Sequence, residues 1–319
     1  METLILCYHN IVPDGTPPEM LEALLAVPAG RFASQVRYLS GRYDTVTLDV
    51  VEQGPEPQKA LVLTFDDGYR AVLDQALPLL SASRLPAYVF VNPEFVGEWN
   101  PRDKLMGLML YGAGDAIKDV ETFLGERVGG LDVRARARRF VELRGALWRT
   151  LARDGASGST EIDRLFERHA DARVRRGLES SRLLSWEDLA RLRDHGIRIG
   201  NHTQRHLELD SLPQAAVRSE IRDAQRALDH RLGGDGAVLS YPRGKVNPMV
   251  LAEAEAAGYR WGLTTVPGRI HDRRPALAAA RVLVSPQGGV PQLLWKTSRL
   301  RLWARTYLRG VPESSVASY

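Results

Sequence analysis

Short apolar runs separated by polar and turn-forming residues recur along this chain of 319 residues. Runs of this length, bounded by Gly, Pro, Asn or Asp, are typical of buried strands. They predict about seven strands, at residues 3–7, 61–65, 87–91, 197–200, 237–241, 260–264 and 281–285.

Amphipathic segments between several of these runs predict helices, at 69–81, 185–195 and 212–232. Ser185 is a suitable N-cap for the second helix, and Gly196 suits a left-handed C-cap. Strand followed by helix, repeated along a chain, favours parallel strands. We therefore expect one principal domain, residues 1–319, built as a parallel α/β barrel.

The interval 94–182 departs from this rhythm. It is too long for a connection and reads as amphipathic helices, for example RARARRFVELRGALWRTLARD. We interpret it as a helical insertion within the domain. Its arginines are expected on a solvated face, and the alternative is that the insertion forms a lid over the substrate.

The amino-acid composition narrows the possible classes of protein and of binding site. A hydrophobic content of 44% allows one large core, and the single cysteine, Cys7, excludes an internal disulfide and a Cys-rich zinc site. A formal charge of +4 without a recognisable motif does not indicate nucleic-acid binding. The start METLILCYHN lacks the features of a secretory signal, so we expect a cytoplasmic protein.

The C-terminal segment, 290–319, interleaves leucine, aromatic and basic residues. This pattern is typical of a cationic amphipathic helix. Packing against the barrel is one interpretation, and peripheral contact with an anionic membrane is the other.

Polar side chains follow two of the predicted strands. Asp66 and Asp67 come directly after the run 61–65, and His202 and His206 follow the run 197–200. Imidazoles four residues apart can bind one ion, and the carboxyl ends of parallel strands meet at one rim. Asp67, His202 and His206 are therefore a candidate metal site. Asp-Asp-Gly could also be turn chemistry alone.

A third strand end carries Tyr241-Pro242-Arg243-Gly244, a sequence that favours a tight turn. Such a turn can present a backbone N–H to a developing oxyanion. An ordinary turn between strand and helix is the alternative.

The order TFDDGY, NHTQRH and YPRG resembles the polysaccharide deacetylases of the NodB-homology type, carbohydrate esterase family four. CYHNI near the start, AYVFV and AGYRWGLTT extend the resemblance over roughly residues 1–92 and 183–285. It implies a distorted (β/α)7 barrel with the helical insertion added, and hydrolysis of an N-acyl amide on an amino sugar.

The resemblance also implies site roles. Asp66 would be the general base, and Asp67, His202 and His206 would hold one divalent metal. The backbone N–H of Arg243 would face the oxyanion. The candidate substrate-binding residues are Tyr241, Pro242 and Trp261.

Two departures from the family pattern stand out. Ser240 occupies the position where relatives often have an arginine that orients the base, so that clamp is absent or comes from elsewhere. The strand at 281–285 also lacks the late Leu-x-His histidine that acts as general acid. His9 is our preferred substitute, and His271 is the second candidate.

The predicted function is therefore metal-dependent removal of an acyl group, expected to be acetyl, from an amino sugar. Zinc is the first expectation for the metal, and iron, cobalt, nickel or manganese are compatible with the same ligands. A cytoplasmic location favours a nucleotide-linked, lipid-linked or small glycoside substrate. The alternatives are a non-catalytic sugar-binding relative and a non-haem iron oxygenase.

Overall fold

The computed structural model describes residues 2–53, 59–154, 156–234, 238–270 and 277–298. Its main sheet is parallel and has the strand order β10-β1-β5-β6-β7-β8-β9. Each predicted strand corresponds to one strand of this sheet: β1 (Glu2–Tyr8), β5 (Lys59–Phe65), β6 (Ala87–Val91), β7 (Arg198–Asn201), β8 (Val238–Ser240), β9 (Trp261–Leu263) and β10 (Val282–Leu283).

The last strand region joins the two edges of the sheet. Ala279 forms a parallel bridge to Leu263 of β9, and β10 pairs with β1 through Val282 and Leu283. The strands thus curl into a distorted (β/α)7 barrel, as predicted. The short strand β4 (Asp44–Thr45) adds to β5, while β2 (Asn10–Val12) and β3 (Ala26–Pro28) form a separate two-stranded sheet.

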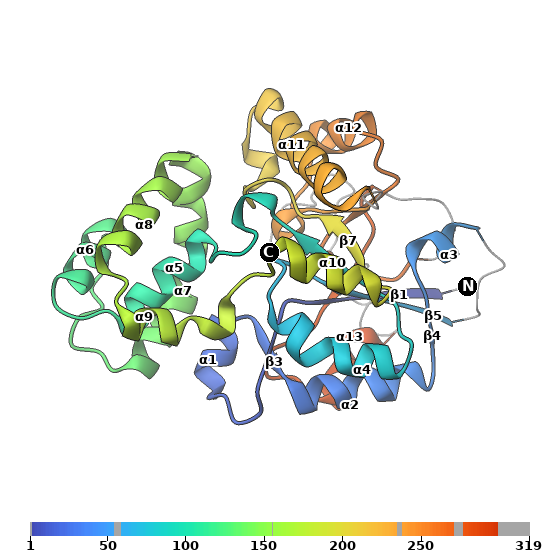
Figure 1. Ribbon diagram of the computed structural model, residues 1–319, viewed down its shortest axis with the longest axis horizontal. Helices are drawn as coiled ribbons and strands as arrows, with labels where there is room; N and C mark the ends of the chain where they lie inside the picture. The colour runs from blue at the N-terminus through green and yellow to red at the C-terminus, as the bar shows by residue number, and fades with distance from the viewer. Residues whose placement is uncertain (1, 54–58, 155, 235–237, 271–276, 299–319) are drawn as a thin grey trace.

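Helices cover the outside of the barrel (Figure 1). The predicted helix at 69–81 is a π-helical turn, Val72–Ala76, that continues into α4 (Leu77–Ala82). Ser185 is the N-cap, as predicted, and it forms a capping box in which Ser185 and Asp188 each bond to the other's backbone N–H. The other helices around the barrel are α2 (Ala29–Ser40), α3 (Leu48–Gln53), α10 (Trp186–Asp194), α11 (Gln214–Leu232), α12 (Pro248–Ala256) and α13 (Val290–Thr297).

Both faces of the strands are buried, which explains their continuous apolar runs. Leu61, Leu63 and Phe65 of β5 pack in the hydrophobic cluster beneath the outer helices, whereas Val62 belongs to a smaller cluster that also contains Trp261. Because side chains alternate along a strand, the residue that follows Phe65 faces the barrel interior.

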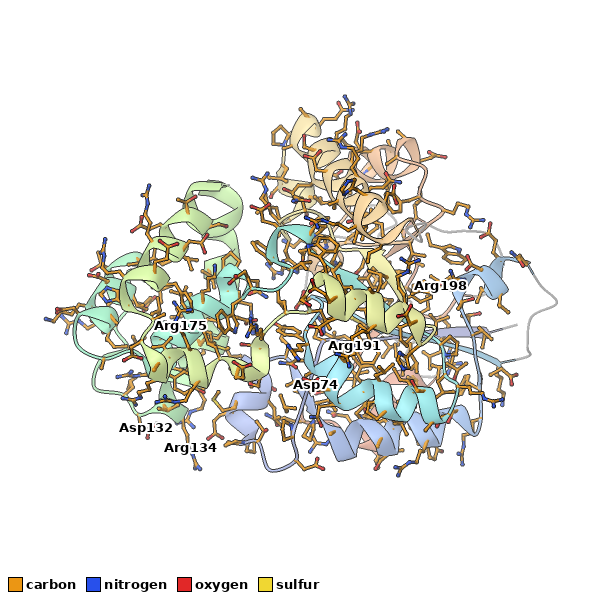
Figure 2. The ribbon with its side chains drawn as sticks, in the orientation of Figure 1. Asp74, Asp132, Arg134, Arg175, Arg191 and Arg198 are labelled. Atoms are coloured by element: carbon orange, nitrogen blue, oxygen red, sulfur yellow. The ribbon has the colours of Figure 1, made fainter. Side chains whose placement is uncertain are left out.

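Residues between β6 and β7 in the sequence form a separate helical lobe, which Figure 1 shows to one side of the barrel. It has its own hydrophobic core, to which α1 (Pro18–Ala23) also contributes. Arg134 and Arg175 project from its surface (Figure 2). The helices of the lobe are α5 (Pro101–Tyr111), α6 (Asp115–Leu124), α7 (Val133–Asp154), α8 (Ala156–His169) and α9 (Ala172–Gly177).

Among the described residues, no helix is long and apolar enough to span a bilayer. The first part of the C-terminal segment predicted to be amphipathic forms α13. This helix packs Leu293 into the hydrophobic core beneath the outer helices. Residues 299–319 lie outside the described part of the chain.

Candidate active site

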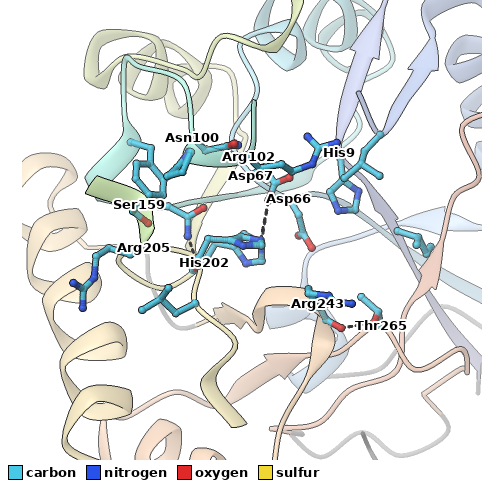
Figure 3. Close-up of a pocket in the computed structure, with 17 residues that line it drawn as sticks. His9, Asp66, Asp67, Asn100, Arg102, Ser159, His202, Arg205, Arg243 and Thr265 are labelled. Atoms are coloured by element: carbon cyan, nitrogen blue, oxygen red, sulfur yellow. Dashed lines mark hydrogen bonds and ion pairs between the residues drawn. The ribbon is translucent and has the colours of Figure 1, made fainter. Parts of the chain in front are cut away.

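The predicted site residues converge at the carboxyl end of the sheet. His9 follows β1, Asp66 and Asp67 follow β5, and His202 follows β7. All four line one cavity of about 340 Å³, together with His206 and Arg243 (Figure 3). Parallel pairing explains the convergence, because it places the ends of these strands on one rim.

The three candidate metal ligands lie close together. One ligand atom from each of Asp67, His202 and His206 lies within 4.8 Å of the other two. Asp67 Oδ1 is 3.4 Å from His202 Nε2 and 3.3 Å from His206 Nε2. Burial raises the pKa of Asp67, but the two imidazoles outweigh burial and hold it well below its usual range.

These residues fit a divalent metal. Asp67 Oδ1 is buried and accepts no hydrogen bond from the described residues. His202 Nδ1 lies 2.7 Å from the carbonyl oxygen of Ser240, which requires an N–H there and leaves the lone pair on Nε2, facing Asp67. One carboxylate and two neutral imidazoles are a ligand set that leaves positions open for water and substrate.

The backbone around the cavity is strained. Six described non-glycine residues have positive φ, and four of them, Leu25, Asp67, His206 and Arg243, line the cavity. Such conformations cost free energy and persist where the surrounding structure imposes them, often at functional sites. Gly68 also has positive φ, and a Cβ there would lie 2.7 Å from Val91 Cγ1.

Asp66 is held by an arginine that sequence reasoning missed. Arg281 Nη1 donates to Asp66 Oδ1 at 2.8 Å, and Nη2 donates to Oδ2 at 2.7 Å. Ser240 Oγ also donates to Asp66 Oδ2, at 3.2 Å, and accepts from Arg281 Nη2 at 2.9 Å. Arg281 is fully buried.

The small side chain of Ser240 leaves the carboxylate of Asp66 open to an arginine from another strand. Thus the clamp that relatives often carry at position 240 is supplied here by Arg281, just before β10. A charged residue at the start of an otherwise apolar strand was the available signal in the sequence. Burial raises the pKa of Asp66, but Arg281 and His202 outweigh burial and lower the pKa far below its usual value.

His9 is partly buried and lines the same cavity as Asp66 and Asp67. A ring nitrogen of His9, Cys7 Sγ and a carboxylate oxygen of Asp66 lie within 4.8 Å of one another. Burial lowers the pKa of His9, while Asp67 and Asp66 act in the opposite direction. His271, the second candidate acid, lies outside the described residues.

The predicted substrate-binding residues do not line the cavity. Tyr241, Pro242 and Trp261 are all buried. Tyr241 packs in a hydrophobic cluster with residues of α11 and α12, and Trp261 packs in the cluster that contains Val62. Closeness in sequence to a motif did not place these side chains at the cavity, because Tyr241 and Trp261 pack in hydrophobic clusters.

The structure instead places the helical insertion against the cavity. Phe95, Asn100, Pro101, Arg102 and Ser159 all belong to the segment 94–182 and line its wall. The insertion is therefore part of the site, although no motif within it indicated this.

Comparisons with known proteins agree with the geometry. A sequence profile of the polysaccharide deacetylase family matches residues 53–262. The chain is 37% identical to YxkH of Bacillus subtilis (strain 168) over 103 residues, which cover 32% of this chain and 37% of that protein. It is 38% identical over 152 residues to the poly-beta-1,6-N-acetyl-D-glucosamine N-deacetylase of Escherichia coli (strain K12), covering 45% of this chain and 20% of that one. The chain thus spans well under half of either relative.

Among solved structures, the fold is similar to the deacetylase PplD of Streptococcus pyogenes in complex with acetate. The TM-score is 0.59 at 18% identity, covering 93% of this chain and 99% of that one. IcaB from Ammonifex degensii gives a TM-score of 0.58 at 19% identity, with 93% and 97% of the chains covered. These likenesses concern the fold. Together with the profile match over residues 53–262, the comparisons show that this chain belongs to the polysaccharide deacetylase family.

Proposed function

We propose that this protein is a metal-dependent N-deacetylase of an amino sugar. The main support is one juxtaposition: the candidate ligands Asp67, His202 and His206 adjoin Asp66, a carboxylate that Arg281 holds ionised inside a cavity. Family membership and the N-deacetylase among the relatives support the same activity.

Asp67, His202 and His206 would hold the divalent metal, with zinc as the first expectation and iron, cobalt, nickel or manganese as alternatives. When bound, such a metal polarises an amide carbonyl and lowers the pKa of a water molecule. The lowered pKa of the water is important here because Arg281 makes Asp66 a weak base. A weak base can remove a proton from a water molecule whose own pKa is lowered.

Asp66 would accept a proton from the water as its oxygen attacks the acetamide carbon. Among the described residues, Oδ1 accepts a hydrogen bond only from Arg281, so a lone pair remains for that proton. The backbone N–H of Arg243 would donate a hydrogen bond to the acetamide oxygen, which becomes negative during the attack. The C–N bond then breaks, His9 donates a proton to the leaving nitrogen, and acetate and the free amine depart.

Arg281 favours catalysis over a non-catalytic sugar-binding relative, because a missing clamp was one of the two reasons to consider that alternative, beside the absent late histidine. A non-haem iron oxygenase would use the same three ligands but has no need of the clamped Asp66. Independence from oxygen distinguishes the hydrolase from the oxygenase.

The test measures acetate released from N-acetylated glycosides, sugar nucleotides and lipid-linked sugars, with each metal added after chelation. Release should disappear with the chelator and return with metal. Asp66→Asn should lower kcat by about 100-fold or more, while Asp74→Asn, a half-exposed control, should leave it unchanged. Full activity of Asp66→Asn would overturn the mechanism.

For location we propose the cytoplasm, with the C-terminal segment 290–319 in peripheral contact with an anionic membrane. Trp295 of α13 is 56% exposed, and the following residues include Arg299, Arg301 and Arg305. Interfacial helices combine such residues. Cosedimentation with anionic vesicles at low salt tests this contact, and its absence would exclude it.

A further inference from the structure

The helical insertion returns to the barrel beside the loop that carries Asp67. Residues 182–184 run antiparallel to residues 68–70, and the two segments share two backbone hydrogen bonds of 2.9 Å and one bridge. The bonds run from Leu184 N to Gly68 O and from Arg70 N to Arg182 O, and the bridge pairs Tyr69 with Leu183. The residues that follow the candidate metal ligand are therefore bonded to the end of the insertion.

The start of the insertion packs against the same place. Residues 97–98 form two further backbone hydrogen bonds with residues 183–184, of 2.8 and 3.0 Å. The side chains of Tyr69, Phe95 and Leu183 form a small hydrophobic cluster between these segments. Both ends of the insertion thus support the loop that follows β5.

The side chain of Tyr69 connects this loop with the first turn of α5. Tyr69 is fully buried, and its hydroxyl donates to Asp103 Oδ2 at 2.9 Å. Arg102 Nη1 bonds to the other oxygen of Asp103 and donates to the Tyr69 hydroxyl at 3.4 Å. Separating a buried ion pair leaves an uncompensated charge, which is strongly unfavourable. The pair of Arg102 and Asp103 is therefore a rigid partner for the hydroxyl.

The loop needs such support because its backbone conformation is unfavourable. Asp67 has a φ of 69° and Gly68 a φ of 72°, two consecutive residues with positive φ. An aspartate keeps such a conformation only where the surrounding structure imposes it. In this conformation Asp67 Oδ1 lies 3.4 Å from His202 Nε2 and 3.3 Å from His206 Nε2. Relaxation of the loop would move the carboxylate away from the imidazoles.

We propose that Tyr69 is a positioning residue for the metal site. Through its bond to Asp103 it ties the loop of Asp67 to the insertion, so that the insertion sets the affinity for the metal. Tyr69 does not line the cavity, so it acts through Asp67 and not on the substrate. The inference rests on the metal-dependent function proposed above and extends the metal site from its ligands to the insertion.

The test compares Tyr69→Phe with a matched control, Tyr88→Phe. Each substitution removes one buried tyrosine hydroxyl, since Tyr88 is 3% exposed and its hydroxyl accepts from the backbone N–H of Leu48 at 3.0 Å. Tyr88 lies near the start of β6, whereas the cavity lies at the carboxyl ends of the strands. Competition with a chromophoric chelator measures zinc affinity, and urea unfolding of the metal-free protein measures stability.

Tyr69→Phe should weaken zinc binding by about tenfold, the smaller end of the effect of removing groups that orient metal ligands. Saturating zinc should restore most of the acetate release. Tyr88→Phe should keep the wild-type zinc affinity, although both variants lose a buried hydroxyl. Asp103→Asn should also weaken zinc binding, and the double variant with Tyr69→Phe should bind zinc no more weakly than the weaker single variant.

Unchanged zinc affinity in Tyr69→Phe, or an equal loss in Tyr88→Phe, would overturn the inference. Additive losses in the double variant would show that Tyr69 acts independently of Asp103 and would overturn it too. If Tyr69→Phe does not fold, Asp103→Asn carries the test, and an unchanged zinc affinity there has the same meaning. A wild type that binds zinc but releases no acetate would contradict the proposed function and leave this inference standing, whereas one that binds no metal would overturn both.

Discussion

At the scale of single residues, the charge pair of Asp66 and Arg281 decides how the site is organised. The carboxylate lies at the end of β5 and the guanidinium precedes β10, two strands separated in the sheet by β1. Ser240 of β8 bonds to both. The base therefore depends on contacts from two strands other than its own.

Arg281→Gln should lower kcat by about 100-fold, since misplacing a catalytic group by about 1 Å has that effect. The double variant Ser240→Arg with Arg281→Ser should recover part of the loss, because it moves the clamp to the position common in the family. Steady-state kinetics measures both. Metal affinity should stay constant, and a double variant no better than Arg281→Gln would contradict the exchange.

His9 leads to a prediction about pH. A general acid must be protonated before it donates, so the rate should fall as pH rises through its pKa. Because burial lowers the pKa of His9, this decline should begin below the ordinary imidazole value of about 6.5. His9→Gln should lower kcat by about 100-fold and remove the decline.

The measurement for His9 is a pH–rate profile of acetate release. His195→Gln is the control, since His195 is exposed and does not line the cavity. A His9→Gln enzyme with full turnover and an unchanged profile would remove His9 from the mechanism.

At the scale of elements, loops placed by helices and strands carry the chemistry. The helix α10 precedes β7 and packs Leu189 and Leu192 into the core beneath the outer helices. It therefore fixes the strand that leads to His202. Its start depends on the reciprocal bonds of Ser185 and Asp188, each 3.1 Å long.

Ser185→Ala should lower the free energy of unfolding by about 1 kcal/mol, because it removes one half of the capping box. Urea unfolding at constant metal concentration measures the change, and kcat should be unaffected. Ser34→Ala, an exposed position within α2, should leave the stability within about 0.5 kcal/mol. Equal losses in both variants would contradict the role of the cap.

At the scale of the whole molecule, the barrel and the insertion have separate hydrophobic cores, and residues of both parts line the cavity. Phe140 lies in the insertion core with 2% of its surface exposed, and the guanidinium of Arg102 lies 5.4 Å above its ring. The insertion core thus supports the wall of the site.

Phe140→Ala should cost about 3–5 kcal/mol, the usual cost of truncating a buried aromatic residue. Because the cores are separate, hydrogen exchange should increase in α5–α9 and not in β5. Leu131→Ala, at a position 39% exposed, is the control. A uniform increase across the molecule would show instead that the two cores unfold together.

Local sequence patterns were enough to predict the barrel and the convergence of its motifs. The apolar runs predicted seven strands, β1 and β5 to β10, because both faces of these parallel strands are buried, whereas the short strands β2, β3 and β4 were not predicted. Strand-then-helix order then implied one rim for Asp66, Asp67, His202 and His206. These inferences need only local pattern and the geometry common to parallel sheets.

The side chains that complete the site became apparent from the folded chain. Arg281 and Ser240 meet Asp66 through the curvature of the sheet, and no local pattern encodes a contact between residues 215 positions apart. Trp261 faces the core because of packing across elements. Side-chain direction at a site depends on neighbours distant in sequence, and those become visible only when the chain is folded.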